Sequence, residues 1–401
     1  MDSSLSISLA LYCPSKAWGG LEMVVARFAG WMQQRGHEVT VFGLPGSQLL
    51  QNIPDGATGI PIKKASRLPF WAGWRLARIC KQKGIRQLIA TTSPSIFVVS
   101  MAGKYDAQLK TWYWQHMQIG HPKKDFLHTW FYKSLERWIT LMPWLKDEVT
   151  MTTRMPAERI EVLPLGIEMQ PFNDQDRAVE ARRKARLVLG LPEKKVLFGM
   201  IGRLDPNKKQ GLLLEAFALL PENYKKEISL VFIGAPTIGH SEGYPAELQA
   251  LAERLDIRND MSLLPFQEKI EQVYAALDFL VMGTHSETYG LVTIEAMAAA
   301  VPVIGAAGGS TVQLLNPDWQ EWPYDIVEVD AFRSSGFLAV QGGVLFRPDD
   351  RLSLNKALQF AIASKDRLEK KAQQIAPKIR EQYSHHVMLE KFEKLFTSRV
   401  D

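Results

Sequence analysis

The chain has 401 residues, of which 46% are hydrophobic and 23% are charged, and its formal net charge is +5. This length exceeds an ordinary domain of about 100 to 200 residues, so it predicts two globular lobes. No stretch offers the roughly 18 uninterrupted apolar residues of a membrane span. Two cysteines, Cys13 and Cys80, are too few for a disulfide framework or a metal cluster.

The start of the chain lacks the basic region of a secretory signal, so we expect a cytoplasmic protein. The modest positive charge favours phosphates or anionic membrane surfaces as partners. We expect no nucleic-acid partner.

Apolar runs of strand length alternate with helical segments in the first half of the chain. Strands are predicted at 7–12, 38–44, 86–93 and 110–116, with a helix at 21–36. Because parallel strands need a crossover, usually a helix, this alternation predicts parallel sheets with helices on both faces.

The pattern restarts after a polar segment at 162–195, and we place the hinge near 166–190. Strands of the second half are predicted at 196–202, 228–235, 261–266, 279–284 and 301–306. The tail, 366–396, is predicted as two helices joined near Tyr383 and Ser384. The fold class is therefore α/β, with two Rossmann-like, doubly wound lobes and a cleft between them, where the carboxyl ends of the strands bind ligands.

Cations gather on the segment that follows the strand at 196–202. Arg203, Lys208 and Lys209 lie between this strand and the helical run 211–220, on a loop expected at the carboxyl edge of the sheet. A solvated turn is the alternative, because Asp-Pro-Asn sequences are common in turns.

Two glutamates flank a predicted helix start further along the chain. Glu287 lies in a loop, Gly290 begins the helix, and Glu295 lies about two turns into it. A helix start offers unpaired N–H groups to a diphosphate. Glu287 could accept hydrogen bonds from sugar hydroxyls and Glu295 from a ribose. A carboxylate in the apolar run 292–304 needs partners, since burying one alone costs several kcal/mol.

These motifs together resemble the retaining family 4 glycosyltransferases of GT-B fold. The resemblance rests on Gly202-Arg203 with Lys208, on the E-x7-E spacing from Glu287 to Glu295, and on Gly19-Gly20 before a helix. It covers most of the chain and is weakest at 45–110 and 316–342. It implies an acceptor-binding lobe at 1–170, a nucleotide-sugar-binding lobe at 171–382, and a C-terminal helix at 383–401 that crosses back onto the first lobe.

The resemblance also implies roles for individual residues. Arg203 and Lys208 would bind the donor diphosphate, Glu295 the ribose, and Glu287 the transferred sugar. The remaining residues implied in donor binding are Gly19, Gly20, Tyr289, Gly290 and Leu291.

His116 matches a family histidine near the reacting sugar, although a histidine here could equally cap a strand. Gly19 and Gly20 would let the backbone approach the donor closely, and a simple tight turn is their alternative explanation.

This sequence departs from the family pattern at several positions. Lys209 and Ala300 stand where the family usually has glycine, and the segment 316–342 is longer than expected. None of these departures removes one of the proposed charges.

No metal site and no cofactor are predicted. Asp174 and Asp176 have the Asp-x-Asp spacing that holds a divalent ion in other glycosyltransferases, but they lie in the polar hinge and are interpreted as solvated. His385 and His386 have no further ligand at metal-binding spacing and are interpreted as surface residues.

Basic and aromatic residues interleave at 63–83 in a pattern typical of an interfacial helix. The residues of this predicted membrane or acceptor surface are Lys63, Lys64, Arg67, Trp71, Trp74, Arg75 and Arg78. The alternative is a core helix whose tryptophans face inward. A second aromatic-rich stretch at 110–138 carries Lys123 and Lys124, and we expect this lobe to dock on the inner face of the cytoplasmic membrane.

The sequence thus predicts a metal-independent hexosyltransferase that uses a nucleotide-sugar, with UDP favoured as the family's commonest nucleotide. The acceptor is expected to be a glycan or a lipid-linked molecule, in lipopolysaccharide or cell-surface polysaccharide synthesis. A non-catalytic two-lobed sugar-binding protein, a phosphorylase and a nucleotide-sugar epimerase are the alternatives.

Overall fold

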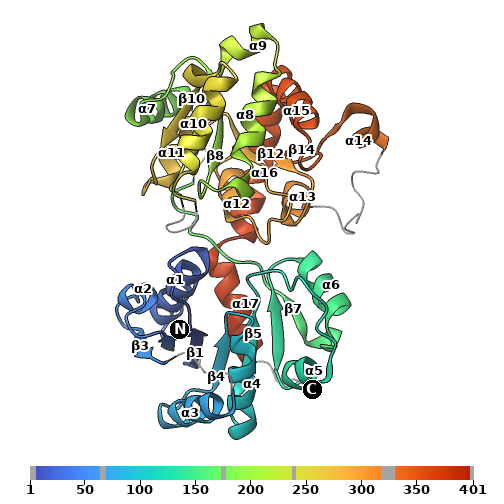
Figure 1. Ribbon diagram of the computed structural model, residues 1–401. Helices are drawn as coiled ribbons and strands as arrows, with labels where there is room; N and C mark the ends of the chain where they lie inside the picture. The colour runs from blue at the N-terminus through green and yellow to red at the C-terminus, as the bar shows by residue number, and fades with distance from the viewer. Residues whose placement is uncertain (1–5, 64–68, 173–177, 237–240, 318–329, 398–401) are drawn as a thin grey trace. The chain divides into compact units, whose positions relative to one another are not determined.

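The computed structural model describes residues 6–63, 69–172, 178–236, 241–317 and 330–397. The chain forms two compact units (Figure 1). Unit 1 comprises Met1–Gly166 and His386–Asp401, and unit 2 comprises Ile167–His385. These boundaries were predicted at 170 and 382. No helix of the described segments is both long and apolar enough to span a bilayer.

Unit 1 is built on a seven-stranded sheet in the order β3-β2-β1-β4-β5-β6-β7. Its strands are β1 (Ser8–Cys13), β2 (Glu38–Gly43), β3 (Thr58–Pro61), β4 (Gln87–Ala90), β5 (Lys110–Trp114), β6 (Arg137–Thr140) and β7 (Ile160–Val162). Every neighbouring pair is parallel, and the strand order reverses at β1. The predicted doubly wound sheet is confirmed.

Helices cover both faces of this sheet (Figure 1). They are α1 (Gly20–Gln34), α2 (Gln48–Gln51), α3 (Pro69–Gln82), α4 (Ser95–Tyr105), α5 (Phe126–Tyr132) and α6 (Pro143–Thr152), with a 3-10 turn at Ala157–Arg159. The central strands β1 and β4 are buried along almost their whole length, as expected where both faces of a sheet are covered. The fully buried side chains Trp112, Trp114 and Trp138 form much of the core.

The last helix, α17 (His385–Thr397), packs on unit 1, although most of the preceding 200 residues belong to unit 2. The Phe392 ring lies 4.8 Å from that of Phe28 and 5.1 Å from that of Trp114, measured between centroids. At its polar side, Glu393 accepts hydrogen bonds from Arg35 at 2.6 and 2.8 Å. The predicted crossing back of the C-terminal helix is confirmed.

Unit 2 contains a second seven-stranded sheet in the order β10-β9-β8-β11-β12-β14-β13. Its strands are β8 (Val196–Ile201), β9 (Ile228–Ile233), β10 (Met261–Leu264), β11 (Phe279–Met282), β12 (Val303–Ala306), β13 (Phe337–Ala339) and β14 (Gly343–Phe346). All pairs are parallel except β13 with β14, which are antiparallel at one edge of the sheet.

The helices of unit 2 surround the sheet and include the first of the two tail helices. They are α7 (Val179–Leu189), α8 (Gln210–Ala218), α9 (Glu222–Glu227), α10 (Tyr244–Arg254), α11 (Ile270–Ala276), α12 (Leu291–Ala298), α13 (Ser310–Leu315), α14 (Asp330–Ser335), α15 (Arg351–Ala363) and α16 (Lys365–Gln382), with 3-10 turns at Pro206–Lys208 and Arg258–Asp260. Helix α16 ends at Gln382 and α17 begins at His385, so the predicted junction of the tail helices is confirmed. His385 and His386 open α17 rather than lying between the helices.

The predicted hinge contains helix α7, and this helix is anchored in unit 2. Arg182 and Arg186 each place a guanidinium nitrogen 2.6 Å from the Asp278 carboxylate, which precedes β11. Asp278 is only 2% exposed and also accepts the Leu197 N–H at 2.7 Å. Burial alone would raise the pKa of Asp278, but the cations Arg186, Arg182 and Lys365 lower it. The segment is therefore part of a folded unit along 179–189, which the prediction missed.

Candidate functional site

The loop between β8 and α8 lies at the carboxyl edge of the second sheet and carries the three predicted cations. The Asp205 carboxylate accepts the Asn207 N–H at 2.9 Å and so caps the 3-10 turn that ends at Lys208. The Gln210 side chain donates to the Arg203 carbonyl at 2.9 Å. These bonds fix the loop backbone while the Arg203 side chain is exposed and Lys208 is half-buried.

Lys209 adopts a left-handed backbone with φ of 65°, and its Nζ lies 2.7 Å from the Asp349 carboxylate. Ala300 also has a positive φ, 56°. Both are positions where the family usually has glycine, and glycine is the residue that adopts this conformation without strain. The Asp349 carboxylate lies 3.6 Å from the His285 ring as well. Asp349 was not among the predicted site residues, since no motif marks it.

The loop after β11 is held in place by a glycine turn that follows β12. The Ser310 N–H donates to the Glu287 carbonyl at 2.9 Å. A Cβ on Gly309 would lie 2.4 Å from the same oxygen, so only glycine allows this approach. Gly290, with φ of 85°, caps α12, which confirms the predicted helix start to within one residue.

These two loops bring Lys208 and Glu287 together. The Lys208 Nζ lies 2.9 Å from the Glu287 Oε2, and the two side chains are 28% and 18% exposed. A Cβ on Gly283 would lie 2.7 Å from the Lys209 Cβ, so glycine at the end of β11 permits the close packing of the two loops. A partly buried ion pair is thus formed between residues predicted to bind different parts of the donor.

Glu295 accepts a hydrogen bond from the Tyr274 hydroxyl of α11 at 2.8 Å. It is the fifth residue of α12, just over one turn from the helix start rather than two, and it is half-buried. The carboxylate therefore has a protein partner, as a carboxylate in an apolar run requires. Burial and the neighbouring Glu295 raise the pKa of Tyr274, so its hydroxyl stays protonated as the donor. Sequence inspection missed Tyr274, because it belongs to an ordinary apolar helix pattern.

Tyr289 and Leu291 complete the predicted donor residues of unit 2. Tyr289 is 5% exposed and Leu291 is the first residue of α12. The Thr293 and Ile294 N–H groups donate to the Gly290 carbonyl, whereas the N–H groups of Leu291 and Val292 precede the first carbonyl that the helix could offer them. One cluster is therefore formed by Lys208, Glu287 and the first turn of α12. The N–H groups at the start of this helix attract anions.

Gly19 and Gly20 stand between β1 and α1 in unit 1. The Gly19 N–H donates to the Glu22 carboxylate at 2.9 Å. Neither glycine has a positive φ, and a Cβ would meet no atom closer than 3.6 Å at Gly19 and none within 4 Å at Gly20. The local fold therefore does not require glycine here, which argues against the tight-turn alternative.

His116 follows β5, which ends two residues earlier than predicted. Its ring centroid lies 4.6 Å from that of Trp114, and its Nε2 is buried without a hydrogen-bond partner among the described residues. Burial lowers the pKa of His116 to about 3, so the ring is neutral near pH 7. An unpaired buried nitrogen is expensive unless a ligand satisfies it.

The loop that carries His116 is braced from two sides. Gln115 accepts the Trp138 indole N–H at 2.8 Å and donates to the Met117 carbonyl at 2.9 Å. The Glu148 carboxylate of α6 accepts the Ile119 N–H at 3.0 Å. Burial raises the pKa of Glu148, although the backbone N–H groups that it accepts oppose this. Sequence inspection did not identify Glu148, which lies 32 positions after His116.

Helix α3 presents its tryptophans outward. Trp71 is 74% and Trp74 is 44% exposed, whereas Gly73, Leu76, Ala77 and Cys80 face the core. Arg75 and Arg78 are exposed on the tryptophan side, as the spacing predicted. The alternative of inward-facing tryptophans is therefore wrong. Lys64 and Arg67 lie outside the described residues.

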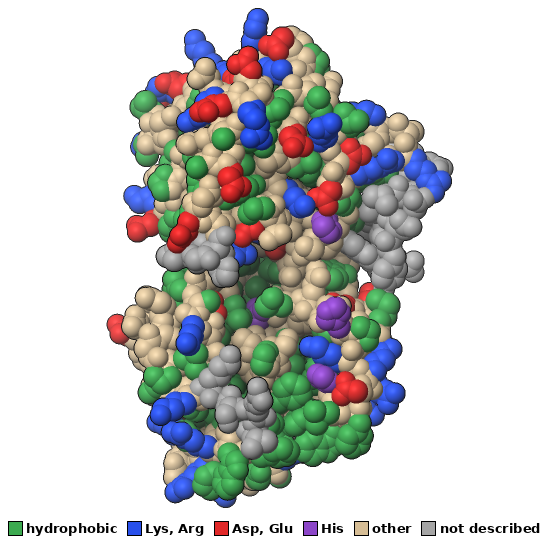
Figure 2. Space-filling view, in the orientation of Figure 1, with side chains coloured by type: hydrophobic (Ala, Val, Ile, Leu, Met, Phe, Trp, Pro, Cys, Tyr) green, Lys and Arg blue, Asp and Glu red, His purple; other side chains and the backbone are tan. Residues whose placement is uncertain are grey.

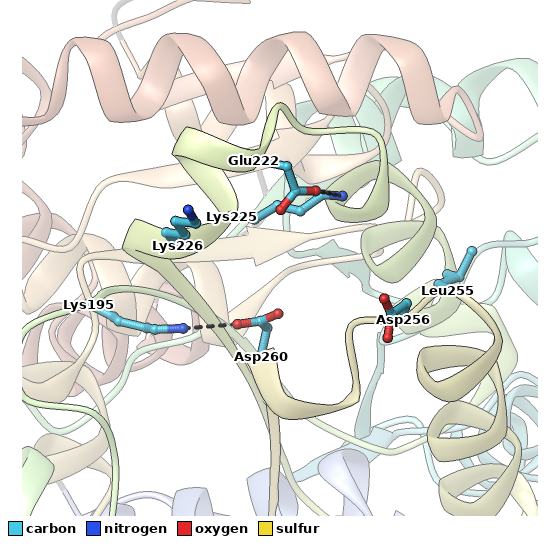
Figure 3. Close-up of a pocket in the computed structure, with 7 residues that line it drawn as sticks. All are labelled: Lys195, Glu222, Lys225, Lys226, Leu255, Asp256 and Asp260. Atoms are coloured by element: carbon cyan, nitrogen blue, oxygen red, sulfur yellow. Dashed lines mark hydrogen bonds and ion pairs between the residues drawn. The ribbon is translucent and has the colours of Figure 1, made fainter.

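A hollow on unit 2, about 300 Å³ in volume, lies at the opposite edge of its sheet (Figure 3). Four of its charged side chains form two ion pairs, because Lys195 lies 2.9 Å from Asp260 and Lys225 lies 3.0 Å from Glu222. Lys195 and Asp260 immediately precede β8 and β10, so this hollow is at the amino edge, away from the cation loop. We do not assign it a ligand.

No group of three or more His, Cys, Asp or Glu side chains suited to a metal ion occurs in the part of the chain that the structure describes. Asp174 and Asp176 lie outside that part.

Comparison with known proteins identifies relatives of both units. Residues 18–170 match the model "Glycosyltransferase Family 4" and residues 181–331 match "Glycosyl transferases group 1". The D-inositol 3-phosphate glycosyltransferase of Mycobacterium sp. (strain KMS) is 27% identical over 330 residues, covering 73% of this chain and 71% of the relative.

Two solved structures show the same fold. HepE of Anabaena in complex with UDP has a TM-score of 0.78 at 17% identity, covering 98% of this chain and 100% of that one. The lipopolysaccharide outer core galactosyltransferase WaaB has a TM-score of 0.66 at 15% identity, covering 98% and 99%. These likenesses confirm the predicted GT-B architecture of two Rossmann-like units.

The two family models match adjoining segments that together span about three quarters of the sequence, one in each unit. The chain therefore belongs to the group 1, family 4 glycosyltransferases of GT-B fold.

Proposed function

We propose that this protein is a retaining, metal-independent hexosyltransferase that takes its sugar from a nucleotide-sugar, with UDP as the favoured nucleotide. The observation that carries the proposal is the cluster of Lys208, Glu287 and the first turn of α12, with Arg203 on the same loop as Lys208. A nucleoside diphosphate leaving group must be stabilised by fixed positive charge, and cations with a helix start supply it without a metal. HepE of Anabaena, which has the same fold, was solved in complex with UDP, and this supports the choice of nucleotide.

The ion pair gives donor binding a defined first step. Lys208 lies 2.9 Å from Glu287, so a diphosphate that attracts Lys208 draws it from the carboxylate. Glu287 then accepts hydrogen bonds from the hydroxyls of the sugar. Arg203, exposed on the same loop, adds the second positive charge.

Glu295, oriented by Tyr274, is assigned to the ribose hydroxyls. Tyr289, Gly290 and Leu291 provide backbone at the helix start for the diphosphate.

In unit 1, we assign Gly19 and Gly20 to close backbone contact with the donor, and His116 to the transferred sugar. The neutral His116 ring can donate or accept a hydrogen bond through its unpaired Nε2. In the proposed reaction the acceptor hydroxyl attacks from the face that the diphosphate leaves, which retains the anomeric configuration. We assign no covalent nucleophile.

A thermal-shift screen with UDP, GDP and ADP and their sugars tests the donor assignment. A ligand that binds only the folded state raises the melting temperature, and we expect the UDP compounds to raise it most. Arg203→Ala should remove most of this shift and lower kcat/KM at least tenfold. Unchanged turnover in Arg203→Ala would show that the site is wrongly placed.

We further propose that the acceptor is a glycan or a lipid-linked molecule of the cell surface, of the lipopolysaccharide type, and that unit 1 docks on the inner face of the cytoplasmic membrane. Large hydrophobic side chains gather on one part of unit 1 (Figure 2). The exposed members on α3 and α5 are Phe70, Trp71, Trp74, Phe126, Leu127 and Trp130. Arg78 lies over the Trp74 ring and Lys104 over the Trp130 ring, at 5.7 and 4.1 Å from the centroids. Aromatic rings beside cations suit an anionic bilayer surface.

Co-sedimentation with vesicles of phosphatidylglycerol and phosphatidylcholine tests this docking. The double variant Trp71→Ala with Trp74→Ala should bind the anionic vesicles at least tenfold more weakly. Met151→Ala, which removes a 56% exposed side chain from α6, is the matched control and should bind normally. Absence of binding by the unaltered protein at low salt would refute the membrane proposal.

A further inference from the structure

A second cavity, about 210 Å³ in volume, lies in unit 1 beside the outward-facing side of α3. It is lined by Tyr12, Ile62, Lys63, Trp71, Ala72, Arg75, Leu76 and Val98. These residues come from β1, the segment after β3, α3 and α4. Four separate elements therefore build it, and it lies within a single unit.

The cavity opens at the edge of the sheet where open α/β folds bind ligands. Tyr12 is the penultimate residue of β1, and Ile62 directly follows β3, where its N–H donates to the Gly43 carbonyl at 2.8 Å. This is the carboxyl edge, which also carries Gly19 after β1 and His116 after β5.

The lining combines an apolar wall with two cations. Ile62, Leu76 and Tyr12 are 7%, 1% and 2% exposed, so the wall belongs to the packed core. Lys63 and Arg75 are exposed, and neither makes an ion pair or a side-chain hydrogen bond to the residues that the structure describes. The cavity therefore suits a ligand in which an anionic group is attached to a hydrocarbon part. The two cations would bind the anionic group, and the apolar wall would contact the hydrocarbon.

The volume limits what the cavity can hold. Pockets for drug-sized ligands have about 300 to 1,000 Å³, so this one suits a single group of a larger molecule. Arg75 offers the planar donor pair that recognises phosphate oxygens, and Lys63 a point charge. The Tyr12 hydroxyl remains protonated, since burial raises the pKa of Tyr12 to about 12.

We propose that this cavity binds a phosphate group of the acceptor through Lys63 and Arg75, with the first carbons of its ester against Ile62, Leu76 and Trp71. The assignment to the acceptor rests on the proposed glycosyl transfer, whereas the binding site itself does not. Both a soluble phosphorylated sugar and a lipid phosphate present this chemistry. The cavity then fixes one end of the acceptor at the same sheet edge as His116.

Fluorine NMR of protein labelled with 5-fluorotryptophan tests the site directly, using hexyl phosphate as the probe and no donor. The Trp71 resonance is assigned by its loss in Trp71→Phe. Hexyl phosphate should shift this resonance. Inorganic phosphate and hexanol should each bind at least tenfold more weakly, because phosphate contacts only the cations and hexanol only the apolar wall. An unmoved Trp71 resonance overturns the proposal.

Charge variants separate this site from general attraction to a basic surface. Lys63→Ala and Arg75→Ala should each weaken hexyl phosphate binding about tenfold, as expected for loss of a charge-assisted hydrogen bond. Lys81→Ala removes an exposed cation from the same helix outside the cavity, and it should change the affinity less than twofold. Equal losses in Lys81→Ala and Arg75→Ala overturn the proposal.

Two further arms identify the source of the phosphate. Binding to vesicles that contain phosphatidic acid, weakened more by Arg75→Ala than binding to phosphatidylglycerol vesicles is, supports a lipid phosphate. Binding of hexyl phosphate without vesicle binding supports a soluble phosphorylated acceptor. The nucleotide thermal-shift screen is independent of this cavity, so failure here leaves the donor proposal intact, and failure there leaves this site intact.

Discussion

At the scale of single residues, the Lys208–Glu287 ion pair joins two side chains that we assign to different parts of the donor. Lys208 is assigned to the diphosphate and Glu287 to the transferred sugar. Glu287→Gln removes the charge that holds Lys208 but keeps the shape of the side chain. We expect UDP affinity to stay the same or rise, because Lys208 is freed, while kcat/KM for the UDP-sugar falls about 100-fold. Lys208→Ala should weaken both. Calorimetry measures the UDP affinity, and initial rates with the UDP-sugar measure kcat/KM. A loss of UDP affinity as large as the loss of kcat/KM in Glu287→Gln would contradict this assignment.

The left-handed backbone at Lys209 makes a second prediction, for stability. Lys209→Gly relieves strain of roughly 1 kcal/mol that Lys209→Ala retains, and both lose the same ion pair to Asp349. The glycine variant should therefore be the more stable of the two by about 1 kcal/mol in urea denaturation. The exposed helical position Lys370 provides the control, since alanine should be more stable than glycine there by about 1 kcal/mol. The same order at both positions would refute the strain at Lys209.

His116 should not titrate near neutral pH. Burial lowers its pKa to about 3 from an ordinary 6.5, so the ring is neutral throughout pH 5 to 8. The carbon-bound proton signal of His116, assigned in NMR spectra by His116→Gln, should stay constant over this range. A titration midpoint of the His116 signal near pH 6.5 would show that water solvates its Nε2.

Residues whose chemistry is unusual for their sequence surroundings could be predicted from the sequence. The residues that contact them could not. Glu295 stands out in an apolar run, whereas Tyr274, which donates to it, looks like any core aromatic. Burial of Glu295 was overestimated, because this residue lies nearer the start of the helix than assumed. Lys208 and Glu287 were identified separately, but 79 positions divide them and only the fold reveals their contact.

At the scale of elements, the docking of α17 on unit 1 depends on an ionised carboxylate. Glu393 accepts from Arg35 and lies 2.8 Å from the His37 Nε2. The His37 Nδ1 accepts the Ile7 N–H, so Nε2 is the nitrogen that donates. Burial alone would raise the pKa of Glu393, but these hydrogen bonds lower it below its usual 4.5.

A lowered folded-state pKa stabilises the fold above the unfolded value, and this contribution is lost as the pH falls through about 4.5 and below. Glu393→Gln should therefore lower the melting temperature of unit 1 by a few degrees at pH 6, with a smaller difference at pH 4. The exposed Glu38→Gln on β2 is the control and should have little effect. A difference that does not shrink at acid pH would show that Glu393 acts through packing alone.

Elements were predictable where the pattern was long. The buried strands β1, β8 and β9 are continuous apolar runs, and each was predicted to within two residues. The short strands β7 and β13 have three residues each, too few for any periodicity. Helix α7 was not predicted, because its polar sequence is typical of a linker. Its ion pairs from arginine to Asp278 show why it is folded.

At the scale of the whole molecule, the two units have separate cores and should respond separately to core damage. Asp278→Asn leaves Arg186, which is 4% exposed, beside a neutral side chain, and losing a partner of a buried ion pair costs about 3–5 kcal/mol. Nine of the eleven tryptophans belong to unit 1, so their fluorescence reports mainly that unit.

In Asp278→Asn, the circular dichroism change in urea should begin at a lower concentration than the tryptophan fluorescence change. The exposed Asp366→Asn on α16 should move neither by more than about 0.5 kcal/mol. Coincident shifts of both signals in Asp278→Asn would show that the units unfold as one.

The packing of α17 on α1 also has a consequence for how the protein is made. Phe28 is synthesised before its aromatic neighbour Phe392, with all of unit 2 translated between them. At about 5–20 residues per second, the nascent first unit waits on the order of ten seconds or more for its final helix. During that interval an apolar face of α1 is uncovered on the ribosome, which makes the growing chain a substrate for chaperones that bind exposed hydrophobic segments.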